Sequence, residues 1–140
     1  KKINNKDLNE LSKVLIKIQN ELFNLGNMLA VDNDFKVDNM PMVTKESIIE
    51  LEKNINYYNE YLSDLNSFVL PGGNELSIRL HLVRVKCRKV ERFVVKILDK
   101  ESIDIIIVEY LNRMSDLFFV LSRYANYKLD DEELTWNPNC

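Results

Sequence analysis

The sequence predicts an all-α protein, an up-and-down bundle of helices in a single domain that spans residues 1–140. Four long stretches carry apolar residues at spacings of three and four, which is the period of amphipathic helices packed around a core. Only three glycines and three prolines occur, so little of the chain is suited to loops and β-turns. The connections between the stretches are short, and short connections make successive helices antiparallel neighbours.

The first helix is expected from Leu8 to Ala30. Its apolar stripe consists of Leu11, Val14, Leu15, Ile18, Leu22 and Leu25. Asp, Asn and Pro interrupt this period in residues 31–43, which predicts a loop. Thr44 then provides an N-cap, and Glu46 gives the next helix an acidic first turn.

The second helix is expected to continue to Leu65. Its narrow apolar seam consists of Ile48, Leu51, Ile55, Tyr58, Leu62 and Leu65. The segment FVLPGG, residues 68–73, ends this helix, because Pro71 fixes its own φ and the two glycines tolerate positive φ. We therefore expect a tight connection with a defined exit direction.

The third helix is expected to follow Asn74 as its cap and to run to about Leu98. Its predicted buried stripe consists of Val83, Cys87, Val90, Val94 and Ile97. The fourth pattern, from Ile103 to about Asn126, is the most apolar of the chain; its opening DIIIVEY would suit a strand, but its length favours a helix. The acidic end of the chain, residues 129–140, is predicted to be an irregular tail.

The composition is that of an ordinary soluble globular protein, with 46% hydrophobic and 29% charged residues. No apolar run approaches the roughly 18 residues that span a bilayer, and no signal-peptide pattern opens the chain. We expect no membrane association and a cytoplasmic location, or an organellar one if a leader precedes Lys1, since the sequence does not begin with Met.

Residues suited to metal binding or covalent catalysis are scarce. Cys87 and Cys140 are too few for a disulfide framework or a zinc site, so reduced thiols are expected. The lone His81 is expected on the exposed side of the third helix, near Arg84 and Arg88, and no protein-built metal site is expected. The chain has neither a Walker-type phosphate loop nor a Gly-x-Ser-x-Gly elbow, so no nucleophile is a candidate.

A group of cations on the third helix contrasts with the net charge of −3. At 100° per residue, Arg84, Arg88 and Glu91 fall within about 60° of one another, and Lys89 and Arg92 flank them. Two guanidiniums one turn apart, oriented by a carboxylate, form a fork that fits a polyphosphate. The alternative, and the commoner case on helix surfaces, is a solvated face with intrahelical ion pairs. We call Arg84, Arg88 and Glu91 the basic row.

A second polar set lies in the fourth helix, where Asn112, Asp116 and Arg123 fall within about 40° of one another inside an apolar run. Such a stripe is expected to be partly buried, and buried polar groups need partners. Two options remain open: bonds across the bundle to the basic row, or contact with a ligand. Nucleic-acid binding is the least favoured function, because the pI is near 5.3 and the cations form one compact cluster.

The segments FVLPGG, RVKCRKVER and YLNRMSDLFFVLSRYAN resemble, in this order, the PduO-type ATP:cob(I)alamin adenosyltransferases. IQNELFNLGNMLA and IIELEKNINYYNEYL resemble that family's two preceding helices, and ELTW followed by Asn-Pro resembles its C-terminal Glu-x-x-Trp. The likeness covers nearly the whole chain. It implies a cobalamin adenosyltransferase-like homotrimer of five-helix bundles, which binds ATP and Mg²⁺ at the subunit interface and transfers the 5′-deoxyadenosyl group to the cobalt of cobalamin, releasing triphosphate. The resemblance also implies a reductase partner that supplies the electrons.

The resemblance also implies roles for individual residues. Arg84, Arg88 and Asn112 correspond to the family's catalytic set, and the residues implied to bind ATP or the corrinoid are these three together with Phe68, Lys89, Glu91 and Asp116. Phe68 matches the aromatic residue that packs under the corrin and keeps the lower axial base off cobalt. Lys89 stands where the family usually has Arg, and Lys keeps the charge but lacks the bidentate fork.

The family begins with a Thr-Arg-x-Gly-Asp-x-Gly phosphate loop and a further helix, and neither precedes Lys1 in this sequence. Four of the five expected helices are therefore visible. Either this segment has been removed, which we favour, or the protein has lost part of its ATP site and is inactive. The rival from another class is a non-catalytic helical module, in which the basic row and the Asn112 stripe register one helix against another.

Overall fold

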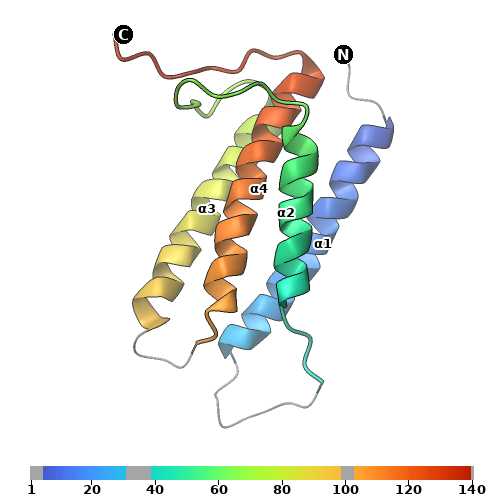
Figure 1. The fold of residues 1–140 in the computed structure, drawn as a ribbon, viewed down its shortest axis with the longest axis vertical. Coiled ribbons are helices and arrows are strands. Elements are labelled where there is room, and N and C mark those ends of the chain that lie inside the picture. Colours follow the sequence, from blue (N-terminus) through green and yellow to red (C-terminus); the bar gives the residue numbers. More distant parts are fainter. Residues whose placement is uncertain (1–4, 31–38, 99–102, 140) are drawn as a thin grey trace.

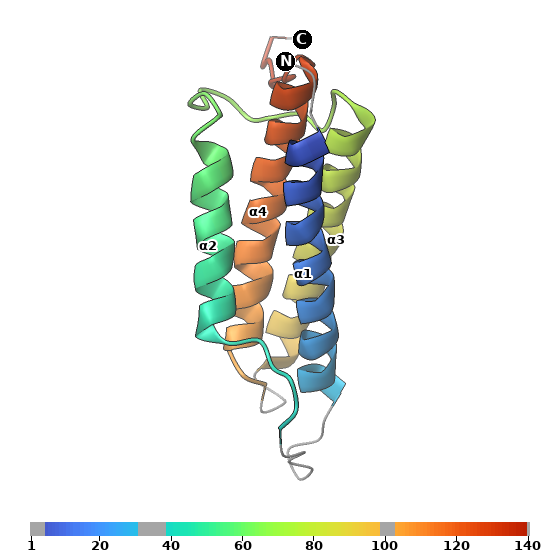
Figure 2. The same cartoon turned by 90° about the vertical axis from the view of Figure 1, so that its right-hand side faces the viewer.

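A computed structural model of the chain describes residues 5–30, 39–98 and 103–139. It contains four helices, α1 (Asn5–Ala30), α2 (Lys45–Asn59), α3 (Glu75–Leu98) and α4 (Ile106–Leu129). In these ranges the only β-structure is an isolated antiparallel bridge between Val69 and Thr135. Figures 1 and 2 show the helices running up and down, with α4 between α2 and α3 and α1 packed across one face. The predicted all-α bundle is confirmed.

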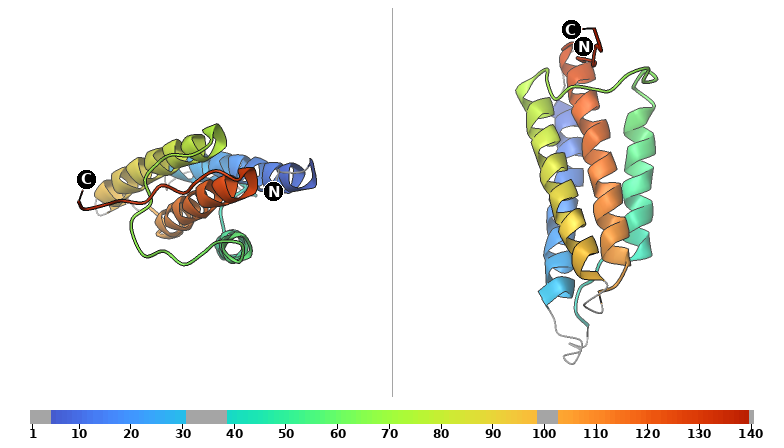
Figure 3. Two further views of the ribbon diagram at one scale, coloured as in Figure 1. Left: turned by 90° about the horizontal axis from the view of Figure 1, so that it is seen from above. Right: turned by 90° about the vertical axis from the view of Figure 1, so that its left-hand side faces the viewer.

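The central helix is α4, which packs against both α3 and α2 (Figure 3). Its side chains with at most 1% exposure are Ile107, Tyr110, Leu111, Ser115, Leu117, Leu121, Ser122 and Ala125. A helix surrounded on most sides must be apolar on most sides, which accounts for the high hydrophobicity of its sequence. It begins three residues later than expected, where Asp104 Oδ1 accepts from the Ile106 N–H at 3.0 Å, and it ends past Asn126 at Leu129.

Helix α1 begins slightly before the predicted Leu8 and contributes Leu11, Ile18 and Leu25 to the core. Polar contacts also attach it to α4. The Tyr110 hydroxyl donates to Glu21 at 2.6 Å, and Lys128 pairs with Asp7 at 3.0 Å.

Helix α2 ends at Asn59, six residues before the predicted Leu65. Leu62 still packs partly against the core, but the chain leaves the helix here and the Ser63 carbonyl accepts from the Arg123 guanidinium at 2.8 Å. A buried cation needs acceptors, and the carbonyls of a regular helix are already taken. The apolar period alone therefore overestimates the length of α2.

Helix α3 buries a different face from the one predicted. Cys87 and Val94 are buried, but Val83, Val90 and Ile97 are each more than 40% exposed, so the predicted stripe is wrong at these three positions. The other buried residues are Ser77, Leu80, His81 and Glu91. Ser77 donates to the Gly72 carbonyl and Glu91 accepts from Asn112, so polar residues occupy part of the buried face. Several apolar residues remain on the outer face, which hydrophobic spacing alone does not anticipate.

The α3–α4 seam is also joined by a thiol. The Cys87 Sγ–H donates to the Leu111 carbonyl at 3.1 Å, and burial raises the pKa of Cys87 to about 12. At the start of α3 the predicted cap is confirmed, since Asn74 Oδ1 accepts from the Ser77 N–H at 2.9 Å. Across the described part of the chain, none of the helices has the length and hydrophobicity to cross a bilayer.

Candidate active site

The basic row on α3 is bonded to the predicted polar stripe on α4. Arg88 Nη1 lies 2.7 Å from Glu91 Oε2, and Asn112 Nδ2 donates to Glu91 Oε1 at 3.0 Å. Glu91 is only 8% exposed, so its carboxylate is held between the two helices. This arrangement orients the Arg88 guanidinium, and the Arg88 side chain as a whole remains 44% exposed and accessible to a ligand.

The network continues along α4. Arg113 Nη2 donates to Asn112 Oδ1 at 3.0 Å, and Arg113 Nη1 lies 3.4 Å from Asp116 Oδ2. Of the two options left open by the sequence, Asn112 therefore bonds across the bundle to the basic row. Asp116 does not cross the seam: its side chain is half-exposed and pairs with Arg113 on its own helix.

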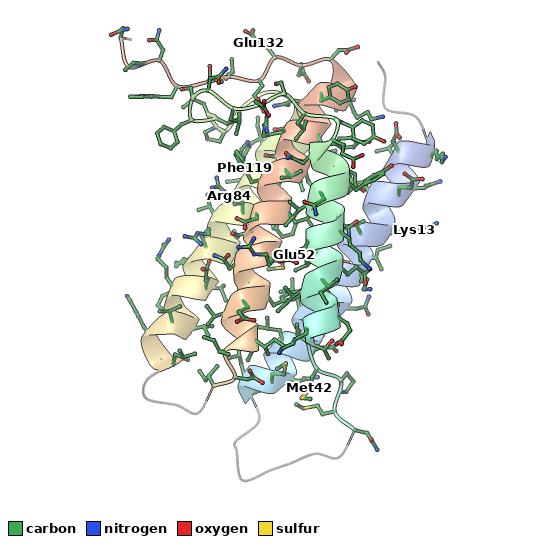
Figure 4. All side chains as sticks on the ribbon, in the orientation of Figure 1. Lys13, Met42, Glu52, Arg84, Phe119 and Glu132 are labelled. Carbon is green, nitrogen blue, oxygen red and sulfur yellow. The ribbon has the colours of Figure 1, made fainter. Side chains whose placement is uncertain are left out.

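Arg84 lies one turn before Arg88 and packs on an aromatic ring of α4. Its guanidinium carbon is 4.7 Å from the centroid of the Phe119 ring, and Figure 4 shows both residues at the α3–α4 seam. Stacking holds the plane of the guanidinium while its N–H edge stays available to an anion. The two arginines thus lie on one side of α3, each fixed by a different contact.

Lys89 lies apart from this network. Its ammonium group is 6.0 Å from the centroid of Phe93, and it lines a small concavity of about 120 Å³ together with Arg92, Phe93 and Lys96. This concavity is on the outer side of α3. Within one chain, the structure therefore brings together Arg88, Glu91 and Asn112, but not Lys89.

An open depression of about 430 Å³ adjoins the network. Three helices line it, with Ile48 and Glu52 from α2, Glu91 from α3, and Val108, Glu109, Asn112 and Arg113 from α4. Figure 4 shows Glu52 on the face of the bundle where α2 and α4 lie side by side. The depression gives a ligand access to the Asn112 amide and the Arg113 guanidinium.

Phe68 lies at the end of the bundle, on the loop between α2 and α3. It is 78% exposed, and its ring meets Trp136 edge to face with centroids 6.1 Å apart. Trp136 belongs to the segment that was expected to be an irregular tail. Residues 130–139 of this segment contain no helix, as expected, but they lie against the Phe68 loop through the Val69–Thr135 bridge instead of standing free.

His81 is not exposed, contrary to the prediction: its residual exposure is 5% and its ring packs against Phe119. Its Nε2 has no hydrogen-bond partner among the described residues. Burial lowers the pKa of His81, the nearby Arg84 lowers it further, and Glu133 opposes both effects. The imidazole is therefore held neutral beside the basic row. The prediction failed because α3 is rotated relative to its apolar spacing.

Sequence reasoning placed Arg123 in the polar stripe but gave it no role in the site. It is 5% exposed and makes a two-pronged pair with Glu133, at 2.7 Å from Nε and 3.1 Å from Nη2. The signal was present in the sequence: an arginine within an apolar helix requires an acid from elsewhere, and Glu133 belongs to the ELTW motif.

The fold and the site define a class: an all-α bundle protein with two arginines beside a hydrogen-bonded interhelical seam and an exposed aromatic pair at one end. Comparison with known proteins gives the family. The family model described as Cobalamin adenosyltransferase matches residues 1–125, and the chain belongs to this family. It is thus a transferase that acts on corrinoids.

The chain is 39% identical over 132 residues to the corrinoid adenosyltransferase of Mycobacterium tuberculosis, covering 92% of this chain and 67% of that protein. It is 38% identical over 117 residues to the Bacillus subtilis enzyme, of which it spans 59%, and 35% identical over 128 residues to human corrinoid adenosyltransferase MMAB, of which it spans 51%. A variant PduO-type ATP:corrinoid adenosyltransferase from Lactobacillus reuteri, complexed with cobalamin and ATP, superposes with a TM-score of 0.87 at 31% identity, covering 96% of this chain and 74% of that one.

Proposed function

We propose that this chain forms the helical part of an ATP:corrinoid adenosyltransferase, which transfers the 5′-deoxyadenosyl group of ATP to cob(I)alamin and releases triphosphate. The observation that carries the proposal is the bonded network from Arg88 through Glu91 to Asn112 across the α3–α4 seam, with Arg84 one turn away. The L. reuteri relative binds cobalamin and ATP, the substrates that this proposal requires.

The reaction balances without a protein nucleophile. A reductase, or a chemical reductant in its place, gives one electron to Co(II) to form Co(I). The electron pair of Co(I) then forms the bond to C5′ of the ribose, while the C5′–O bond breaks and its electron pair leaves with the triphosphate. Charge develops on the departing phosphate oxygens, where fixed cations stabilise the transition state most.

Arg84 and Arg88 supply those cations. Glu91 fixes the Arg88 guanidinium at 2.7 Å and Phe119 fixes that of Arg84, so neither needs to reorganise as the charge develops. Asn112 already donates to Glu91, and among the described residues its Oδ1 accepts from Arg113 alone, whose side chain is 41% exposed. A change in the Arg113 rotamer would free that Oδ1 for a hydroxyl of the nucleotide. Asp116 pairs with Arg113 and would therefore influence which rotamer it adopts.

A homotrimer with ATP between subunits would account for Lys89. Its ammonium group lies on the outer side of α3, where it can reach the phosphates held by a neighbouring chain. The same side exposes Leu82, Val85 and Phe93 by more than half of their surfaces, and exposed apolar patches of this kind mark interfaces. This arrangement makes each ATP site a product of two chains.

Phe68 would act as an apolar wedge beneath the corrin. Its ring is 78% exposed, so it can pack against a flat macrocycle without unfolding its own surroundings. An aromatic ring at the lower face excludes the axial base, and loss of an axial ligand lowers the energy of the orbital that accepts the electron. Reduction of Co(II) thereby becomes easier.

Mg²⁺ would accompany ATP. This ion is usually bound by substrate phosphates and one or two carboxylates, and no group of three or more His, Cys, Asp or Glu side chains suited to a metal occurs in the described part of the chain. Glu91 and Asp116 are already paired with arginines, so they fit Mg²⁺ poorly as they stand. The roles given above to the side chains do not depend on the ion.

The proposal is tested by mixing the full-length protein with ATP, Mg²⁺ and chemically reduced cobalamin and following adenosylcobalamin by its absorbance. Product formation at a rate above that without protein is expected. No product from the full-length protein would refute the activity.

The competing function is a non-catalytic helical module, which is favoured by the fact that Arg88 and Arg113 both have acidic partners within the chain. Thermal unfolding with millimolar ATP separates the two functions. A ligand at about 100 times its dissociation constant stabilises the protein that binds it by roughly 2.7 kcal/mol. A non-catalytic module without an ATP site predicts no change in melting temperature.

A further inference from the structure

The segment Glu133–Trp136, which we call the strap, lies antiparallel to the Phe68 loop. The Leu70 N–H donates to the Leu134 carbonyl at 2.8 Å, and the Trp136 N–H donates to the Phe68 carbonyl at 2.7 Å. The Ser67 hydroxyl donates to the Trp136 carbonyl at 2.8 Å. Hydrogen bonds to the strap therefore lie on both sides of Phe68, the residue proposed to support the corrin.

The strap is anchored to the core at its other end. Glu133 pairs with the buried Arg123 of α4, and the same guanidinium binds the Ser63 carbonyl at the start of the Phe68 loop. The side chain of Leu134 lies against Gly72, where a Cβ would come within 2.9 Å of its Cδ1. One buried arginine thus ties both the strap and the loop to α4.

The Phe68 ring itself has few other constraints. Its side chain is 78% exposed, and Trp136 is the aromatic ring that it contacts, at 6.1 Å between centroids and 66° between planes. An exposed side chain held only by its own backbone samples several rotamers, whereas an edge-to-face contact favours one of them. The distance by which the Phe68 ring projects from the loop therefore depends on its contact with Trp136.

We infer that Trp136 is a positioning residue for Phe68 and that the strap sets how far the Phe68 ring stands out beneath the corrin. The inference rests on the proposed function, since it assigns to the strap the exclusion of the lower axial base. It gives the ELTW motif a task in the reaction: Glu133 anchors the strap to the core and Trp136 orients the wedge.

The coupling can be measured without turnover, because Trp136 is the single tryptophan of the chain. If the two rings hold each other, Phe68→Ala frees the indole, lowers its fluorescence anisotropy and shifts its emission to the red. The matched control is Asn137→Ala, which removes only a local turn contact to the Asn139 N–H at 2.9 Å. Unchanged anisotropy in Phe68→Ala would overturn the inference.

Its consequence for the reaction is measured with Trp136→Ala, in the presence of ATP, cob(II)alamin and a chemical reductant that supplies the electron for Co(I). We expect kcat to fall about tenfold or more, because displacement of a positioned group by about 1 Å can cost about 100-fold. The KM for ATP should not change, and less of the bound cob(II)alamin should show the spectrum of the form without its lower base. Trp136→Phe should recover most of both effects, and Asn137→Ala should behave as wild type.

Two results would overturn this role. Wild-type kcat and wild-type cob(II)alamin spectra in Trp136→Ala would mean that the strap does not set the wedge. Weaker cobalamin binding with an unchanged spectrum of the bound form would make Trp136 a direct corrin contact instead. If the wild-type protein itself forms no adenosylcobalamin, the proposed function fails, and the anisotropy of Phe68→Ala still decides whether the two rings are coupled.

Discussion

The turn that precedes α3 makes a strong prediction for Gly73→Ala. Gly73 has φ +92°, and a Cβ there would lie 2.1 Å from Asn126 Oδ1 and 2.6 Å from Nδ2. The Asn126 side chain, 2% exposed, would have to move and lose three hydrogen bonds: one to the Gly72 carbonyl at 3.1 Å and two from Asn74, at 3.1 Å from its N–H and 2.8 Å from Nδ2.

The cost follows from these contacts. Three hydrogen bonds at about 1 kcal/mol each contribute about 3 kcal/mol, and a non-glycine residue at positive φ adds about 1 to 2 kcal/mol. We therefore expect Gly73→Ala to lower the free energy of unfolding by about 4 to 5 kcal/mol. Urea denaturation followed by circular dichroism measures it, and at an m-value near 2 kcal/mol/M the midpoint should fall by about 2 M.

The same change elsewhere provides the control. Gly26 lies inside α1 with no atom within 4 Å of a Cβ placed there. Gly26→Ala should therefore raise stability by about 0.5 to 1 kcal/mol, since alanine is the better helix former. A Gly73→Ala protein within about 1 kcal/mol of wild type would refute the reasoning, and so would equal destabilisation by the two substitutions.

Three further predictions concern the site. Arg88→Ala should lower kcat by about 100-fold or more, because one fixed donor at a developing anion is lost, and helicity should not change. Arg79→Ala is the control, because Arg79 forms an exposed pair with Glu75. An unchanged rate in Arg88→Ala would remove Arg88 from the site. The pKa of His81 is below its ordinary value of 6.5, so the native state binds fewer protons than the unfolded state, and stability should fall as the pH drops below about 6.5. In thermal melts from pH 7.5 to 5, the Tm of His81→Phe should therefore depend less on pH than the Tm of the wild type. Equal slopes of Tm against pH would contradict this prediction. Millimolar ATP should raise the Tm of the full-length protein, and less so in Asn112→Ala, whose amide holds Glu91 in place; an equal shift would exclude Asn112 from the site.

The helices could be predicted from the sequence because their apolar spacing and their caps agree. Asn74 precedes α3 and caps it, and the length of the fourth pattern outweighed the strand-like DIIIVEY at its start. The meeting of Arg88, Glu91 and Asn112 was also foreseeable in outline. A partly buried amide in an apolar helix needs a partner, and the neighbouring helix offered a carboxylate.

The remaining features depend on tertiary contacts that local pattern does not encode. Val83 and Val90 fit a buried stripe as well as Leu80 does, and which face of α3 turns inward is decided by contacts with α4 and with the loop before α3. The early end of α2 and the docking of the strap both follow from Arg123, whose guanidinium needs acceptors at Ser63 and Glu133. These partners are 60 and 10 residues away along the chain, beyond the reach of any period.

The reactivity of the buried thiol of α3 provides a measure of how often the bundle opens. Cys87 is 5% exposed, donates to the Leu111 carbonyl and has a pKa raised to about 12. In the closed bundle it therefore has little contact with solvent and no significant thiolate fraction. In a Cys140→Ser protein, where it is the only cysteine left, alkylation by a maleimide would occur only when α3 separates from α4. The labelling rate would then report how often the α3–α4 interface opens. Slower labelling in the presence of nucleotide would mean that the bound ligand stabilises the closed interface.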